Sequence, residues 1–140
     1  MKALHSIALS FCLLFVTAAA NAQGFSVRAN IPFDFVVANQ TLPAGEYEIR
    51  PGAPNDVTLI IQSSDGSKAA LATTYACGGG APSTQTELVF HHVGRQYWLS
   101  QIQVQGYSEG RQLPKSRAEA EVALNQKADN VVIVADLVNR

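Results

Sequence analysis

The stretch FSVRANIPFDFVV, Phe25–Val37, carries an apolar side chain at every odd position. Its even positions include Ser26, Arg28, Asn30 and Asp34. A period of two sustained over these thirteen residues is typical of a β-strand with one buried face. We therefore predict that the stretch forms part of an antiparallel sheet.

Pro32 lies on the polar side of this stretch. Because proline has no N–H to donate to a neighbouring strand, it is tolerated at an edge, a bulge or a bend. We expect the strand to bend near Pro32 and to pair with different neighbours on either side. Asn39–Gly45 contains the Pro and Gly of a turn, and Glu46–Arg50 then alternates again. This second run predicts a strand antiparallel to the first.

A hairpin is predicted at Asp65-Gly66. The dipeptide separates two runs that we interpret as strands from their alternate positions: Val57, Leu59 and Ile61 before it, and Ala69, Leu71, Thr73 and Tyr75 after it. Asp-Gly between such runs is among the strongest short-range hairpin signals. The glycine-rich segment Cys77–Ser83 follows and is predicted to be a flexible loop.

A second hairpin is predicted for Thr86–Val93 and Gln96–Val104. Gly94-Arg95 between them suits a two-residue turn that starts with glycine. Both strands carry apolar residues on both faces, which predicts central strands or strands partly covered on their second face.

The pattern changes after Pro114. Ser116, with Glu119 three residues later, matches the capping box of a helix start, and Arg117–Lys127 is rich in helix-forming residues. We expect a helix of about three turns here, followed by a buried closing strand at Val131–Ala135. The apolar stripe expected on the helix is narrow: Ala118, Val122 and Ala123.

These segments together predict an all-β fold of about seven strands with one short C-terminal helix. Consecutive hairpins favour an antiparallel meander, arranged as a barrel or a sandwich, over a parallel α/β sheet.

Residues 1–22 have the three parts of a secretory signal peptide. Lys2 supplies a positive charge, Ile7–Ala19 is apolar, and Ala-Asn-Ala at 20–22 is a small-x-small cleavage pattern. We predict cleavage after Ala22, which leaves one β-rich domain at 23–140. The apolar run is shorter than the roughly 20 residues of a membrane-spanning helix. We therefore expect a periplasmic or extracellular protein with no stable membrane span.

The charged residues and cysteines limit the possible partners. The chain has 10 Lys and Arg against 11 Asp and Glu, and loss of Lys2 leaves nine against eleven. Clustered basic residues recognise nucleic acid and anionic membranes, so we expect neither as a partner. Cys12 departs with the signal peptide, which leaves Cys77 with no cysteine to pair with inside the chain. It is a candidate reactive thiol or, alternatively, an inert, half-buried cysteine.

Five segments resemble a family of small exported bacterial proteins known mainly from acidobacterial genomes. They are Ile31–Phe35, Thr41–Tyr47, Leu88–His91, Tyr97–Ile102 and Arg111–Ser116. The most specific part is the pair IPFDF and TLPAGEY between positions 31 and 47. The resemblance implies a self-contained exported domain and carries over no catalytic residue.

His91 and His92 are the only histidines after the signal peptide, so imidazole chemistry must use one of them. Neighbours on a strand point to opposite faces and do not readily bind one metal together. Zinc needs three or four protein ligands; Glu87 shares the face of His91, and Cys77 would have to join them. We expect ordinary strand histidines, with no metal site and no cofactor.

Serine hydrolysis would need a hydroxyl, a histidine and an acid from separate segments. Ser100 lies on the strand opposite the histidines, and Asp34 is an available acid. However, no serine stands in a Gly-x-Ser-x-Gly turn, so we expect no catalytic residues. Asp34 is then interpreted as an outward charge that protects a strand edge.

The candidate ligand-binding residues are three aromatic residues and one basic residue. Trp98, Tyr97 and Tyr47 could stack on a sugar or line a cavity. Arg111 belongs with Lys115 and Arg117 to a small basic cluster that could hold an anion. Since Tyr97 and Trp98 are neighbours on a strand, at most one of them faces a given cavity.

The sequence favours a non-enzymatic exported module that binds a cell-envelope partner or a small apolar or carbohydrate ligand. One alternative is a small hydrolase or metal-dependent enzyme that uses His91 or His92. Another is a structural or assembly subunit that associates through edge strands or Cys77, and the oligomeric state is left open. Convergence of the histidines with Ser100 and Asp34 would favour the enzyme, and their dispersal would favour binding.

Overall fold

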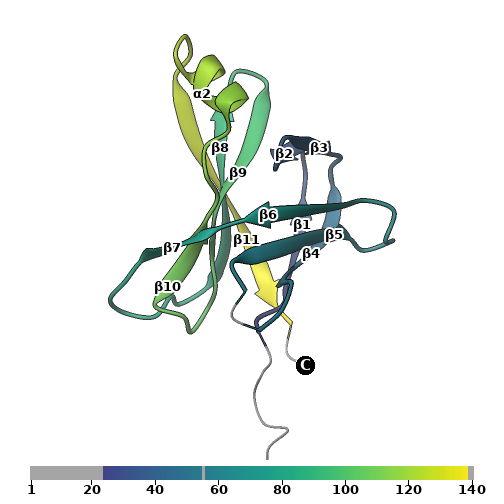
Figure 1. The fold of residues 1–140 in the computed structure, drawn as a ribbon, viewed down its shortest axis with the longest axis vertical. Helices are drawn as coiled ribbons and strands as arrows, with labels where there is room; N and C mark the ends of the chain where they lie inside the picture. The colour runs from purple at the N-terminus through teal and green to yellow at the C-terminus, as the bar shows by residue number, and fades with distance from the viewer. Residues whose placement is uncertain (1–23, 55, 139–140) are drawn as a thin grey trace, which may run out of the picture.

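The structure is a computed structural model that describes residues 24–54 and 56–138. In these residues eleven strands form a nearly closed, barrel-like sheet, and one short helix accompanies it (Figure 1). The predicted all-β fold is confirmed, with more strands than expected. The predicted signal peptide lies outside the described residues.

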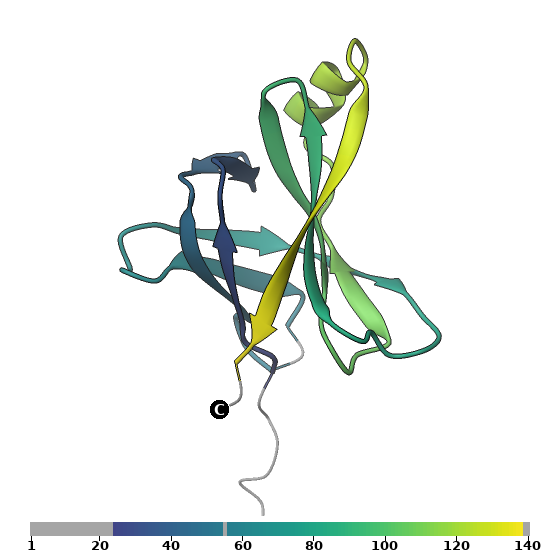
Figure 2. The same ribbon diagram turned by 180° about the vertical axis from the view of Figure 1, so that it is seen from behind.

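Hydrogen-bonded neighbours in the sheet follow the order β3-β2-β9-β8-β11-β1-β4-β5-β6, and β10 joins β9 to β7 as a side branch. β2 pairs with β9 in parallel, whereas its pairing with β3 is antiparallel. β11 lies between β8 and β1 and so links the two halves of the sheet (Figure 2). The strands are β1 (Val27–Ile31), β2 (Phe35–Val37), β3 (Gln40–Leu42), β4 (Gly45–Pro51), β5 (Thr58–Ser63), β6 (Ala69–Thr73), β7 (Tyr75–Gly78), β8 (Thr86–Val93), β9 (Gln96–Gln103), β10 (Glu109–Gln112) and β11 (Ala128–Leu137).

The bend at Pro32 is confirmed. β1 ends at Ile31 and β2 begins at Phe35. β1 pairs with β4 and β11, whereas β2 pairs with β3 and β9. The carboxylate of Asp34 accepts a hydrogen bond from the backbone N–H of Ala44 at 2.9 Å. At this bend the chain therefore crosses from one half of the sheet to the other.

The turn predicted over Asn39–Gly45 is only partly correct, because β3 occupies its middle. A two-residue turn at Ala38 and Asn39, with φ of 49° and 62°, reverses the chain between β2 and β3. Positive φ at both central residues is the geometry of the tightest hairpins, and Asn tolerates it well. The hairpin needs so few residues that its second strand lies inside the predicted turn.

The barrel-like sheet is open between the β2–β3 hairpin and β6, which lie at the two ends of the strand order. The side-chain amide of Gln40 donates to the backbone carbonyl of Ala69 at 3.3 Å across this opening. This hydrogen bond joins the two ends of the strand order, since β3 and β6 are the last strands on either side.

The flexible loop predicted from Cys77 onward is wrong for its first residues. Cys77 and Gly78 belong to β7, where they pair with Gly110 and Glu109 of β10. β10 has no alternation of apolar and polar residues, so its sequence, EGRQ, gives no strand signal.

Both predicted hairpins are confirmed, at Asp65-Gly66 between β5 and β6 and at Gly94-Arg95 between β8 and β9. Gly94 has φ of +64°, the left-handed conformation for which glycine is suited.

The helix predicted over Arg117–Lys127 is shorter in the structure, where α2 spans Arg117–Ala123. Its N-cap is Ser116, as predicted, and the Ser116 hydroxyl accepts from the backbone N–H of Glu119 at 3.1 Å. The expected apolar stripe is wrong at Ala118, which is exposed, whereas Val122 and Ala123 are half-buried. Glu119 is the buried residue of the helix.

The closing strand begins at Ala128 and is longer than the predicted Val131–Ala135. It joins the two halves of the sheet, but it is not buried on both faces, since Val132 and Val134 are exposed. The β-branched run therefore marks a strand correctly and overstates its burial.

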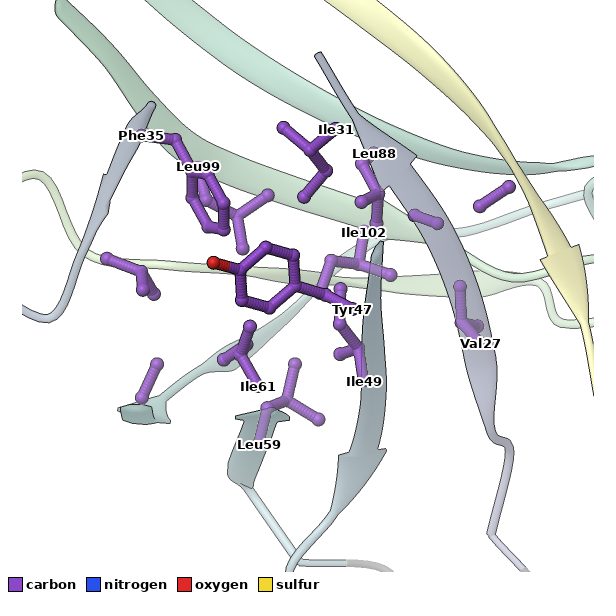
Figure 3. Packing of buried hydrophobic residues seen from close by; sticks show 14 of the residues in the cluster. Val27, Ile31, Phe35, Tyr47, Ile49, Leu59, Ile61, Leu88, Leu99 and Ile102 are labelled. Carbon is purple, nitrogen blue, oxygen red and sulfur yellow. The ribbon is translucent and has the colours of Figure 1, made fainter. Parts of the chain in front are cut away.

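The core lies between the two halves of the sheet, and its larger side chains come mainly from β1, β2, β4, β5, β8 and β9 (Figure 3). Tyr47 lies near its centre, with the ring of Phe35 edge-on at a centroid distance of 5.1 Å. The Tyr47 hydroxyl donates to the carbonyl of Pro43 at 2.6 Å. Burial, and secondarily the carboxylates of Asp65 and Asp34, raise the pKa of Tyr47.

The turn between β5 and β6 is held by the Asp65 carboxylate. It accepts hydrogen bonds from the hydroxyl of Ser63 at 2.7 Å and from the backbone N–H and hydroxyl of Ser67 at 2.9 and 2.7 Å. These bonds, that from the Ser63 hydroxyl first, lower the pKa of Asp65 to about 2. Hydrogen bonds to the charged form of a carboxylate have this direction of effect.

We expect the Asp65 carboxyl carbon to titrate in NMR with a midpoint near 2, and the Ser63→Ala and Ser67→Ala variants to titrate higher. A lowered folded-state pKa means that the contribution of Asp65 to stability is full above its ordinary pKa and is lost as the pH falls toward 2. A midpoint at the ordinary value of 3.8 in the wild type would contradict this description of the turn.

Candidate functional site

Ser100 stands at an irregularity in the β8–β9 hairpin. The register shifts between Val89 and Phe90, and Ser100 is left as an extra residue on β9. Such a bulge re-aims side chains and is frequent beside active sites. Three consecutive residues of β9 are buried beside this irregularity: Trp98, Leu99 and Ser100. In a regular strand with one buried face, successive residues would alternate between buried and exposed.

Ser100, His91 and Glu119 form a hydrogen-bonded network between β9, β8 and α2. Glu119 Oε1 lies 2.7 Å from His91 Nδ1, and His91 Nε2 lies 3.1 Å from Ser100 Oγ. An ionised carboxylate can only accept hydrogen bonds. With Glu119 ionised and the imidazole neutral, the ring proton lies on Nδ1, and Nε2 accepts from the Ser100 hydroxyl.

The network is shielded on one side and open on the other. The side chain of Glu119 is 6 % exposed and that of His91 is 28 % exposed, while Ser100 as a residue is 8 % exposed. Solvent therefore reaches the imidazole edge more readily than the carboxylate that orients it.

The N-cap of α2 positions Glu119. Because the Ser116 hydroxyl binds the backbone N–H of Glu119, the helix begins at a fixed residue, and α2 rests against β8. The sequence predicts Glu119 as the far end of a capping box, whereas its carboxylate contacts His91. The signal that could have identified it is spacing: Glu119 precedes Val122 and Ala123 by three and four residues, on one helix face. A carboxylate on a face expected to be buried needs a donor.

The two histidines point to opposite faces, as predicted. His92 stacks on Tyr97 with ring centroids 4.2 Å apart, and Tyr97 stacks on Phe33 at 3.8 Å. His91 instead joins Ser100. Asp34, the acid considered from the sequence, binds the backbone of Ala44, so the predicted set converges only in part and a different acid completes it.

A mostly apolar cleft of about 200 Å³ lies where β9 changes its neighbour, and we call it the Trp98 cleft. β9 pairs with β2 at Trp98 and with β10 at Gln101 and Ile102. The walls come from Trp98 and Leu99 of β9, the β2–β3 hairpin, the end of β6, and the segment that leads into α2. Glu119 belongs both to this wall and to the hydrogen-bonded network.

Trp98, which lines this cleft, carries an unusual group. Its residue is 4 % exposed, and its indole Nε1 is buried without a hydrogen-bond partner among the described residues. More than nine in ten buried polar groups in proteins have a partner. An unpartnered donor on a residue that lines a cleft therefore calls for an explanation.

The other candidate ligand residues are placed differently. Tyr97 lies on the opposite face of β9 from Trp98, in the stack with His92. Tyr47 is 1 % exposed in the core, although it borders a second hollow of about 230 Å³ between residues 43–47 and 63–68. Arg111 lies within β10, half-buried, while Lys115 borders the Trp98 cleft. Of the four predicted ligand residues, Trp98 alone lines this cleft.

Cys77 is half-buried in β7. Burial raises the pKa of its thiol, and a hydrogen bond with Gln101 opposes this only in part. The thiolate is the reactive form of cysteine, so the structure favours the inert alternative for this residue.

We expect iodoacetamide to alkylate native mature protein at pH 7 roughly tenfold more slowly than the same protein in denaturant. The rate should continue to rise as the pH passes the ordinary pKa of a thiol. Intact-mass kinetics measure it directly, because Cys77 is the one cysteine after residue 22. Equal native and denatured rates would contradict the raised pKa.

Among residues 24–54 and 56–138, no three His, Cys, Asp or Glu side chains are grouped so that they could hold a metal ion. The same part of the chain contains no helix with the length and apolar character needed to cross a membrane. Comparisons with protein-family models, curated proteins and solved structures give no match. The resemblance to the exported acidobacterial family stays a prediction.

Proposed function

We propose that the protein is an exported binding module whose ligand site is the Trp98 cleft. The observation that carries this proposal is the buried indole N–H of Trp98, which has no acceptor among the described residues. A buried donor without a partner costs about 1–3 kcal/mol. An occupant with an oxygen acceptor would recover that free energy on binding.

The size and lining of the cleft limit the occupant. About 200 Å³ suits a molecule no larger than an aromatic ring with a short substituent, below the usual range of ligand pockets. The walls are mostly apolar, and their polar members besides Trp98 are Asn39, Thr73, Lys115, Ser116 and Glu119. We therefore propose a small, mainly apolar ligand that carries one oxygen acceptor; a carbohydrate or a cell-envelope partner is the alternative.

Trp98 is the only tryptophan of the chain, so its fluorescence reports on this site alone. We expect phenylacetamide to change the emission of the mature protein in a saturable way. Phenylacetate tests whether Lys115 favours an anion, and N-acetylglucosamine tests the carbohydrate alternative.

Thr73→Phe places a ring at the rim of the cleft and should abolish the response. Leu71→Phe is the matched control, since Leu71 lies on the same strand, is 64 % exposed and does not line the cleft. No saturable change with any of the three compounds would refute the binding proposal. A response to the sugar alone would replace the apolar ligand by a carbohydrate.

Export is part of the same proposal and has its own test. When the full chain is expressed in a Gram-negative bacterium, we expect a periplasmic or released product that begins at Gln23. Signal peptidase requires small residues at the cleavage pattern, so a variant with leucine at Ala20 and Ala22 should accumulate as precursor. N-terminal sequencing checks both, and a cytoplasmic product that begins at Met1 would contradict export.

A further inference from the structure

We propose that Ser100 is an activated nucleophile, with His91 as its general base and Glu119 as the acid that orients the imidazole. The substrate class is small, unhindered esters. This site shares Glu119 with the Trp98 cleft, but the reaction does not depend on a ligand bound in that cleft.

The atoms of the network are in the order that nucleophilic catalysis requires. The carboxylate binds Nδ1 of the imidazole and the hydroxyl binds Nε2, at 2.7 and 3.1 Å. This is the arrangement of the serine, histidine and acid triads that recur on unrelated folds, which are identified by geometry and not by sequence position. A nucleophile within hydrogen-bond reach of a base, with the base held by a third group, is the diagnostic feature.

A second buried serine shows that this fold can satisfy a hydroxyl without an imidazole. Ser26 is buried as deeply as Ser100, and its hydroxyl donates directly to the carboxylate of Glu48 at 2.8 Å. Ser100 is instead placed on a histidine whose edge is open to solvent. The bulge that removes Ser100 from regular pairing with β8 is a further feature associated with functional sites.

The proposed reaction begins when Ser100 Oγ attacks the ester carbonyl carbon while its proton passes to His91 Nε2. The tetrahedral intermediate then expels the alkoxide, which takes that proton and leaves as the alcohol. A water molecule attacks the acyl-serine in the same way, with His91 as base, and releases the carboxylic acid and Ser100. Glu119 keeps the imidazole oriented and stabilises its cationic form throughout.

Ser100 is 8 % exposed, so only compact reagents should reach it. We assign a nucleophile, a base and an orienting acid, and no oxyanion hole. The hydrogen-bond donors of an oxyanion hole supply a large part of the rate enhancement in acyl transfer. We therefore expect stoichiometric modification of Ser100 to be easier to detect than rapid hydrolysis.

The test is reaction of the mature protein with diisopropyl fluorophosphate, followed by intact mass and peptide mapping. Attack by Ser100 forms an O–P bond, breaks the P–F bond and releases fluoride, while the proton passes to His91. We expect one adduct, on Ser100, and no adduct on the protein unfolded in denaturant. p-Nitrophenyl acetate should release nitrophenol in a burst that leaves an acetyl group on the same residue.

Variants separate activation from folding. Ser100→Ala should remove the adduct, and His91→Gln should slow its formation by about 100-fold or more. Glu119→Gln should slow it by at least about tenfold. Ser26→Ala is the matched control and should label like the wild type, with circular dichroism confirming that each variant is folded.

Two results would overturn the proposal. One is the absence of both adducts, the diisopropylphosphoryl group and the acetyl group from p-nitrophenyl acetate, on Ser100 in wild-type protein under conditions that label chymotrypsin completely. The other is an adduct that forms equally fast in folded His91→Gln. The first result needs no variant, so the proposal stays testable even if substitutions in the network prevent folding.

Discussion

Replacing Phe35 with alanine is expected to lower the free energy of unfolding by about 3–5 kcal/mol. Phe35 is fully buried, and its ring meets Tyr47 and Phe90 edge-on at centroid distances of 5.1 and 5.6 Å. It also lies just after the bend at Pro32, where the two halves of the sheet meet across the core (Figure 3). Truncation would remove contacts to both halves.

Chemical denaturation of the mature protein measures this loss. Leu71→Ala is the control, because Leu71 is largely exposed on β6 and its truncation should change stability by no more than about 0.5 kcal/mol. If Phe35→Ala were as mild as Leu71→Ala, the core described above would be incorrect.

His91→Ala is expected to lower the free energy of unfolding by about 2–3 kcal/mol, because it leaves the buried Glu119 carboxylate without its hydrogen-bond donor. Glu119→Ala should also destabilise, since α2 would lose its polar contact with β8. The double variant should lose less than the sum of the two, with a coupling of about 0.5–3 kcal/mol.

Denaturation of the two single variants and the double variant gives the coupling. Lys127→Ala combined with His91→Ala is a control, because Lys127 is exposed and pairs with Asp129 outside the network. Additive losses for His91 and Glu119 would show that the hydrogen bond between them is not formed in solution.

Local signals explain what the sequence predicted of the fold. The two-residue period from Phe25 to Val37, the bend at Pro32 and the turns at Asp65-Gly66 and Gly94-Arg95 depend on residues close together in the chain. Tyr47 shares its phase with Ile49 in the alternation of β4, so the same rule could have placed it in the core instead of a ligand site.

Non-local pairing explains what the sequence did not predict. β2 pairs with β9 in parallel, and β7 pairs with β10. These segments are far apart in the chain, and neither sequence contains a pattern that predicts its partner. β10 is stabilised by backbone hydrogen bonds to two strands and needs no apolar alternation of its own.

The candidate site shows the same division. That Ser100 faces the histidines follows from the predicted hairpin, and a strict count from Gly94-Arg95 places Ser100 on the face of His91. The acid depends on where α2 lies against the sheet, which hydrophobic patterning does not specify. The sequence therefore offered Asp34, while the structure supplies Glu119.

The central claim is that the Trp98 cleft takes a ligand with an oxygen acceptor, and the indole N–H signal of Trp98 tests it most directly. A single such signal is expected in a ¹H–¹⁵N correlation spectrum, since the chain has one tryptophan. We predict that phenylacetamide shifts this signal in a saturable manner and slows its exchange with solvent, and that Thr73→Phe prevents both effects. A signal that stays at its free position and exchange rate throughout the titration would contradict the claim.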